Sequence, residues 1–189
     1  MRNQVQRFNH IPDEELMRRM AEGCEASFGE LYDRYGSRMH RYFYRMLGQN
    51  AVRADDFTQD LFLKIIEKKA LYDPSRRFST WLYTVAGNMV KNEYRRISRV
   101  PDMPEVQEDF EENFSESFDS QLFEQQLQLA LESLDNVQQQ CFVLRYQEEL
   151  SLKEIAEILD CPEGTVKSRL FYTLKKLANK LRVFAGALA

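Results

Sequence analysis

The sequence predicts an all-α fold of two small helical domains, an N-terminal helical bundle and a C-terminal four-helix domain with a helix-turn-helix, joined by an acidic flexible linker. Apolar residues recur three or four positions apart through most of the 189 residues, which is the spacing of amphipathic helices. Glycine and proline are few, 7 and 5, as long helices require. Residues 101–120 instead carry eight acidic side chains and no basic one, and such a self-repelling stretch forms no packed core of its own. We therefore expect domains at residues 13–99 and 121–183, with the linker at 100–120.

Composition and charge exclude several classes of protein. No run of eighteen apolar residues exists and the first ten residues lack the apolar core of a signal peptide, so we expect a cytoplasmic protein with no membrane insertion. The three cysteines form no CxxC pair and only two histidines accompany them, so we expect no metal site, no cofactor and no disulfide framework. The net charge of −4 does not describe how charge is distributed along the chain, because residues 1–100 carry 18 basic and 13 acidic side chains.

The first predicted helix begins at Pro12, with acidic residues in its first turn. Residues 25–47 keep a three-or-four-residue apolar spacing, and Gly48 ends this long second helix. Its arginines form a predicted exposed basic row: Arg34, Arg38, Arg41 and Arg45.

A third helix is predicted at residues 51–69, with acids near its start at Asp55, Asp56 and Asp60. Three carboxylates can form a metal or acid-base site. However, no histidine, paired glutamate or nucleophile lies near them in the sequence, so we expect no catalytic site. A docking surface for a basic partner is the favoured interpretation.

A short loop at residues 70–78 leads to a fourth helix at 80–99, for which Ser79 is the expected N-cap. This helix mixes aromatic rings with cations, the combination that single-stranded nucleic acid needs, because bases stack on rings and the backbone attracts positive charge. The alternative is a core helix anchored by Trp81 with a basic tail, and we expect Trp81 and Leu82 to lie at least partly in the core.

The C-terminal domain begins with a helix marked by Leu122, Leu127, Leu131 and Leu134, followed by a second at residues 137–146. Residues 150–181 then predict two helices joined at Asp160-Cys161-Pro162, because proline cannot continue a helical hydrogen-bond ladder. The last helix has an apolar seam at Val166, Leu170, Leu174, Leu177 and Leu181.

The opposite side of this last helix is polar and basic. Between residues 164 and 182 there are six lysines or arginines and no acid, and such a positive rod fits a DNA major groove. A solvated basic face with no ligand is the alternative, and spacing alone favours neither.

Four motifs in this order resemble the bacterial RNA polymerase sigma factors of the extracytoplasmic-function (ECF) group of the sigma-70 family. They are ASFGELYDRY (26–35), ADDFTQDLFLK (54–64), FSTWLYTVAGNMVKNEYRR (78–96) and LSLKEIAEILDCPEGTVKSRLF (150–171). The resemblance implies a transcription initiation factor without a catalytic centre. Its partners would be promoter DNA, the clamp and flap of the large subunits of core RNA polymerase, and an anti-sigma factor.

The resemblance also implies the residues of each contact. Polymerase binding would fall to Asp55, Asp56, Gln59, Asp60 and Phe62. Single-stranded −10 DNA would be bound by Tyr72, Arg76, Arg77, Trp81, Asn88, Lys91, Arg95 and Arg96. The −35 duplex would be read by Thr165, Lys167, Ser168, Arg169, Phe171, Tyr172 and Lys175. The linker acids would mimic a nucleic-acid backbone in a basic polymerase channel.

The chain departs from the family pattern at several positions. Gly87 stands where the family often has arginine, and so do Gln140 and Tyr172, while Asp135 replaces a common proline. Gly87 and Tyr172 adjoin predicted base-reading positions, so we do not expect the promoter preference of any one relative.

Two functions of other classes compete with this reading. A helix-turn-helix transcriptional regulator that acts without core polymerase would have no need of segments 54–64 and 78–96. A nuclease built on Asp55, Asp56 and Asp60 is the more distant alternative.

Overall fold

In the computed structural model the described residues are 8, 10–97, 127, 129–131 and 133–185, and every regular element among them is helical. The predicted linker at 100–120, together with Leu122 and Arg99, lies outside the described residues, so the domain limits stay predictions. No helix in the described part of the chain combines the length and apolar character that crossing a membrane requires.

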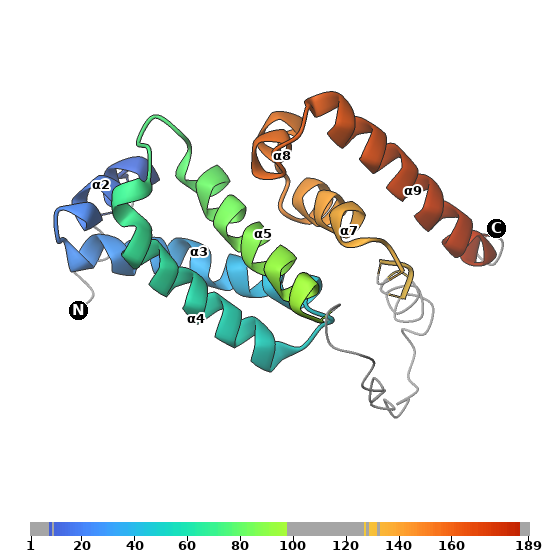
Figure 1. Cartoon of the computed structure of the whole chain (residues 1–189), viewed down its shortest axis with the longest axis horizontal. Coiled ribbons are helices and arrows are strands. Elements are labelled where there is room, and N and C mark those ends of the chain that lie inside the picture. The colour runs from blue at the N-terminus through green and yellow to red at the C-terminus, as the bar shows by residue number, and fades with distance from the viewer. Residues whose placement is uncertain (1–7, 9, 98–126, 128, 132, 186–189) are drawn as a thin grey trace.

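The described residues of the N-terminal part form four α-helices and a short 3-10 turn. They are α2 (Asp13–Ala21), α3 (Glu25–Met46), α4 (Ala51–Lys68), the 3-10 turn η1 (Lys69–Leu71) and α5 (Phe78–Ile97). Helix α3 packs against α2 and α4, and α5 lies beside α4 (Figure 1). The helices predicted from apolar spacing are confirmed to within two residues at most ends.

The start of α5 differs from the prediction. Ser79 is not the N-cap, because the helix already begins at Phe78. The Phe78 backbone N–H donates to Glu14 Oε1 at 3.0 Å, so a carboxylate of α2 lies at the N-terminal end of α5. A glutamate there also suits the positive end of the helix dipole.

The basic row of α3 is also not exposed as predicted. Arg34 donates to Asp13 Oδ1 at 2.6 Å and to Glu30 Oε1 at 2.7 Å, and it holds the backbone carbonyls of Phe8 and Ile11. Arg38 and Arg45 are half-buried against the C-terminal part of the chain. Only Arg41 of this row is exposed.

The C-terminal part contains α7 (Asn136–Phe142), a π-helical turn η2 (Val143–Gln147), α8 (Leu152–Ile158) and α9 (Glu163–Ala185). Asp135 caps α7 by accepting from the Val137 and Gln138 N–H groups. The predicted turn between α8 and α9 is confirmed, and Asp160 adopts a left-handed φ of 48°, which aspartate tolerates better than most residues.

The buried seam of α9 is Val166, Leu170, Thr173 and Leu177, all less than 7 % exposed. Leu174, predicted in this seam, is 42 % exposed. Thr173 replaces it because the spacing from Leu170 to Leu177 is completed by position 173 as well as 174.

The two parts of the molecule pack directly on each other. Helix α5 lies against α8 and α7, and α3 also contacts α7, whereas α9 packs on α7 and α8 on their side away from α5 (Figure 1). One continuous apolar cluster includes Tyr83 and Ala86 of α5 together with Leu144, Leu150 and Ile155 of the C-terminal part. The core therefore crosses the boundary between the predicted domains.

Candidate nucleic-acid and polymerase interfaces

The outward side of α9 carries exposed side chains that can contact DNA. Phe171 is 62 % exposed and Tyr172 is 58 % exposed, and their rings meet edge to face with centroids 5.5 Å apart. Lys167, Ser168 and Lys175 are exposed beside them. We call these five residues the α9 face.

Arg169 and Thr165 flank the α9 face but are half-buried. Arg169 Nη1 donates to Cys161 Sγ at 3.5 Å, so its guanidinium is held against the turn before α9. The Thr165 carbonyl accepts from the Ser168 hydroxyl at 2.9 Å. Both residues are less free to reach bases than Lys167, which points into solvent although its helical position is close to the buried seam.

Helix α8 is fixed at its start by a reciprocal cap. The Ser151 hydroxyl accepts from the Glu154 N–H at 3.2 Å, while Glu154 Oε2 accepts from the Ser151 N–H at 2.9 Å. This capping box fixes where α8 begins, and the Asp160 turn at its other end leads into α9.

Helix α5 presents an exposed polar and basic side near its C-terminal end. Asn88, Lys91, Arg95 and Arg96 are exposed there, and we call them the α5 face. Arg96 donates from Nε and Nη2 to the Glu93 carboxylate at 2.8 Å each, which orients its guanidinium along the helix.

The loop before α5 exposes Arg76 and Arg77, as predicted, but not the ring of Tyr72. Tyr72 is 8 % exposed, its ring packs against Trp81 with centroids 5.2 Å apart, and its hydroxyl donates to the Arg76 carbonyl at 2.5 Å. The predicted contact of Tyr72 with a base is therefore corrected to a supporting role in shaping the loop. Trp81 is half-buried, as expected.

The outer side of α4 is acidic. Asp55, Asp56, Gln59 and Asp60 are exposed there. Phe62, predicted to join them, is 3 % exposed, and its ring packs edge to face on Tyr32 at 4.8 Å and on Phe28 at 6.1 Å. Phe62 therefore belongs to the α3–α4 packing.

Leu63 replaces Phe62 on this surface, since it is 57 % exposed. The sequence offers a signal for it, because Leu63 lies four residues after Gln59 and three before the partly exposed Ile66. Asp55, Asp56, Gln59, Asp60 and Leu63 are called the α4 face below.

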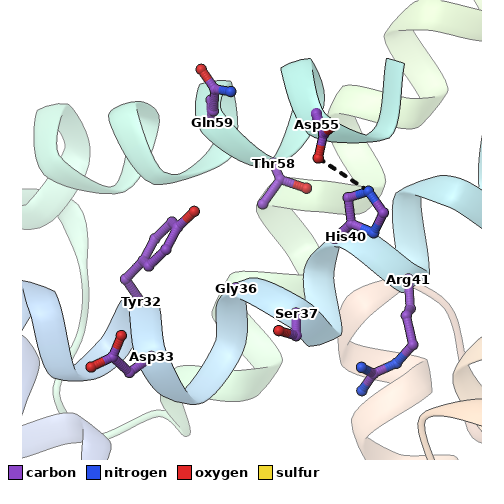
Figure 2. A pocket seen from close by; sticks show the side chains of 9 residues that line it. All are labelled: Tyr32, Asp33, Gly36, Ser37, His40, Arg41, Asp55, Thr58 and Gln59. Atoms are coloured by element: carbon purple, nitrogen blue, oxygen red, sulfur yellow. Dashed lines mark ion pairs between the residues drawn. The ribbon is translucent and has the colours of Figure 1, made fainter. Parts of the chain in front are cut away.

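A polar groove of about 480 Å³ runs between α3 and α4 beside the α4 face. Figure 2 shows its lining, in which Gln59 of α4 lies across from Tyr32 of α3 and Asp55 lies across from His40. His40 Nε2 lies 3.2 Å from Asp55 Oδ1 at one end. Within the residues described, no three histidine, cysteine, aspartate or glutamate side chains are grouped so that they could hold a metal ion.

The chain is similar to curated proteins of one family. It is 30% identical over 183 residues to the ECF RNA polymerase sigma factor SigW of Bacillus subtilis (strain 168), covering 88% of this chain and 95% of that protein. The chain belongs to the ECF RNA polymerase sigma factors. The ECF RNA polymerase sigma-E factor of Escherichia coli (strain K12) is also 30% identical, over 184 residues that cover 91% of this chain and 95% of that protein.

Models of two sigma-70 regions match this sigma factor. Sigma-70 region 2 matches residues 31–100, which include the α4 face and the α5 face, and sigma-70 region 4 matches residues 124–177, which include the α9 face. The chain is thus a transcription initiation factor of the sigma-70 family. A regulator that acts without core polymerase is not favoured, and sigma factors are not enzymes.

Solved structures share the fold. The structure of CnrH in complex with the cytosolic domain of CnrY has a TM-score of 0.70 at 24% identity, covering 90% of this chain and 97% of that one. The sigma factor RpoE in complex with the anti-sigma factor NepR from Bartonella quintana has a TM-score of 0.66 at 20% identity, covering 82% and 97%.

Proposed function

We propose that this sigma factor binds core RNA polymerase through the α4 face, reads the −35 duplex with the α9 face and captures unpaired −10 bases with the α5 face and the Arg76–Arg77 loop. The observation that carries the proposal is the α9 face itself. Two large aromatic side chains are more than half exposed there, on a helix whose residues 164–182 hold six cations and no acid.

The chemistry of the α9 face suits direct reading of base pairs. A lysine donates to the acceptor atoms of guanine, a serine hydroxyl donates or accepts, and an aromatic ring contacts the thymine methyl group. Thr165 and Arg169 are half-buried at the start of the helix. We propose that they contact phosphates of the DNA backbone and not the bases.

The α5 face suits a single strand. Asn88 has both an amide donor and an acceptor for the edge of an unpaired base, while Lys91, Arg95 and Arg96 follow one helix side where a phosphate backbone can run. Trp81, half-buried beside the loop, offers the exposed part of its ring for stacking.

The α4 face and the adjoining groove suit a basic partner surface. The carboxylates of Asp55, Asp56 and Asp60 would attract it, and Leu63 would supply apolar contact area. The same surface is proposed to be covered by an anti-sigma factor, as a bound anti-sigma factor is named for RpoE of Bartonella quintana. We propose that the protein acts in the cytoplasm by binding alone, without cofactor or catalysis.

The experiment that tests the proposed function is transcript start mapping with core polymerase, this sigma factor and a library of promoters randomised in the −35 element. Wild-type protein should start transcription from a defined set of sequences. A Tyr172→Ala variant should relax the preference at one or two base pairs by about 5- to 100-fold, because a good base contact discriminates by about 1–3 kcal/mol.

Asn179→Ala is the matched control, because Asn179 is exposed on the same helix two turns beyond Tyr172. Its −35 preference should equal that of the wild type. A Tyr172→Ala variant with an unchanged preference at every position would show that α9 reads DNA with another face.

A further inference from the structure

Two cysteine thiols of the C-terminal part share one guanidinium. Cys141 lies in α7 and is fully buried, whereas Cys161 lies in the turn between α8 and α9 and is partly exposed. Arg169 Nη1 donates to Cys161 Sγ at 3.5 Å. The Arg169 guanidinium also forms a side-chain hydrogen bond to the Cys141 thiol. The two sulfur atoms are therefore neighbours, although they belong to different elements.

The surroundings of the two thiols give them different access to solvent. Cys141 belongs to the buried apolar cluster that also contains Ile155 and Val166, and Cys161 packs against the edge of this cluster. Helix α7, which carries Cys141, packs on α9 (Figure 1). A dissolved reagent therefore meets Cys161 before it can reach Cys141.

The two thiols also differ in reactivity. Burial raises the pKa of the Cys141 thiol to about 11, above its ordinary value of 9.0, although the charge of Arg169 acts in the opposite direction. Because the thiolate is the nucleophile, the protonated and buried Cys141 does not react first with an oxidant. Cys161 is thus the first thiol to react, and Cys141 is the neighbour that can react with its product.

Arg169 connects the two thiols to the α9 helix. A guanidinium has five N–H donors in one plane, and thiol sulfurs are weak acceptors, so donors remain for a stronger acceptor such as a phosphate oxygen. The proposed function gives Arg169 a phosphate contact. The thiols hold the guanidinium at the turn before α9 and so determine where that contact is made.

We propose that Cys161 and Cys141 form an oxidisable thiol pair that positions Arg169 for its phosphate contact, and that a hydroperoxide converts the pair to a disulfide and thereby weakens binding of the −35 duplex. The part of the inference that concerns DNA rests on the proposed function. The oxidation of the pair does not, and it is tested first without DNA.

The chemistry takes two steps. The Cys161 sulfur attacks one oxygen of the hydroperoxide, the O–O bond breaks, and Cys161 becomes a sulfenic acid while an alcohol leaves with the thiol proton. This step oxidises the sulfur by two electrons and reduces the hydroperoxide. The Cys141 sulfur then attacks the Cys161 sulfur, the S–O bond breaks, and the hydroxide leaves as water with the Cys141 proton. A dithiol reductant reverses the disulfide by exchange.

The disulfide changes the start of α9. Its formation draws Cys161 toward α7, and Cys161 is close in the chain to Glu163, the first residue of α9. The first turn of α9 moves with it, and Arg169 loses the two thiol groups that held its guanidinium. In the cytoplasm proposed above, both thiols stay reduced until an oxidant appears, and disulfides formed there are transient and redox-sensing.

The first test uses the full chain without polymerase or DNA. The protein is treated with hydrogen peroxide, the remaining thiols are alkylated, and the peptides are mapped by mass spectrometry. A disulfide between Cys141 and Cys161 should form in the wild type. It should also form in Cys24→Ser, the matched control, which removes the half-buried third cysteine in the N-terminal part. A wild-type chain in which Cys141 stays free, or pairs with Cys24, would overturn the thiol pair.

The second test measures DNA binding by the assembled complex. The sigma factor is oxidised, the peroxide is removed, and core polymerase and a labelled promoter are added at several salt concentrations. The oxidised form should bind about tenfold more weakly, which is the loss expected for one charged hydrogen bond. Its log–log salt slope should be smaller by about 0.9, the value for one phosphate contact. Dithiothreitol should restore both quantities.

A promoter without the −35 element is the DNA control, and it should bind the oxidised and reduced forms equally. An equal loss on both promoters would show that oxidation acts elsewhere and would overturn the role of Arg169. Cys161→Ser cannot form the disulfide, so its affinity should be the same before and after peroxide. A peroxide effect that persists in this variant would also overturn the proposal. If the disulfide forms but the reduced protein shows no preference for the −35 element, the thiol pair stands and the proposed function is wrong.

Discussion

Glu93 joins two helices through a single carboxylate. Arg53 of α4 donates to Glu93 Oε1 at 2.5 Å, and Arg96, one turn further along α5, donates to both oxygens at 2.8 Å. The hydrogen bonds from Arg96, followed by the positive charges of Arg96 and Arg53, hold the pKa of this carboxyl below its ordinary value of 4.5 despite its burial. The charged form is therefore favoured by folding.

This pKa shift predicts how stability depends on pH. Because the folded-state pKa is lowered, the stabilisation by Glu93 is fully present above the unfolded value of about 4.5 and is lost as pH falls through the lower, folded value. Glu93→Gln should therefore flatten the loss of unfolding free energy below about pH 5. Urea titrations at a series of pH values measure it. Glu67→Gln, an exposed change on α4, should keep the wild-type slope, and a Glu93→Gln variant with that slope would contradict the prediction.

Single residues were predictable from the sequence where a local pattern determines their surroundings. The exposure of Asp56, Ser168 and Tyr172 follows from helical periodicity alone. The burial of Glu148 and the close contact of Gly87 with Gln140 could not be predicted, because their environments are formed by residues far away in the chain, and Arg38, which donates to Glu148, lies 110 positions from it. Phe62 was placed on the wrong side because a resemblance, and not the spacing, assigned it to a surface.

At the scale of the helices, the sequence predicts starts and stops well when the capping group is local. The turn at Pro162 is an example. The structure also has local caps at Asn50 and Ser151, which fix the starts of α4 and α8. The prediction of a local cap fails at α5. At its N-terminal end the Phe78 N–H donates to Glu14 of α2. The prediction of an exposed basic row on α3 failed for a related reason, since Arg34, Arg38 and Arg45 meet carboxylates of other elements.

Helix α4 allows a direct test of polymerase docking. The α4 face is exposed and acidic, so reversing one charge should slow association with a basic partner and change its salt dependence. Asp56→Lys should lower the affinity for core polymerase by about tenfold at low salt, measured by fluorescence anisotropy of labelled protein.

Glu157→Lys is the control for that charge reversal, because Glu157 is exposed on α8 and lies outside the α4 face. It makes the same change in net charge, so an equal loss of affinity in both variants would mean that overall charge, and not the α4 face, governs binding.

In the whole molecule, charge is segregated along the chain, whereas the apolar core is shared between its two parts. The basic residues gather in residues 1–100 and in α9, while the acids gather in residues 101–120, so a net charge of −4 does not describe any surface. The apolar core crosses from α5 to α8, and this crossing was not foreseen, because amphipathic spacing shows that a face is buried but not what covers it.

The shared core predicts how the chain unfolds. A helical unit of about 60 residues buries only about 60% of its surface alone, so the C-terminal part draws stability from its contact with α5 and α3. A side chain added at Gly87 of α5 would overlap the amide nitrogen of Gln140 on α7 and weaken this contact. Wild-type protein should melt in one cooperative transition by calorimetry, whereas Gly87→Leu should melt in two, with the C-terminal part at the lower temperature.

The difference between the two melting temperatures measures how strongly the contact with α5 and α3 stabilises the C-terminal part. Each kcal/mol of lost contact energy lowers the melting temperature of a domain of this size by about 4–8 °C. Gly29→Leu, which adds the same side chain in open space, should retain one transition. A single transition in Gly87→Leu at the wild-type temperature would mean that the two parts do not stabilise each other.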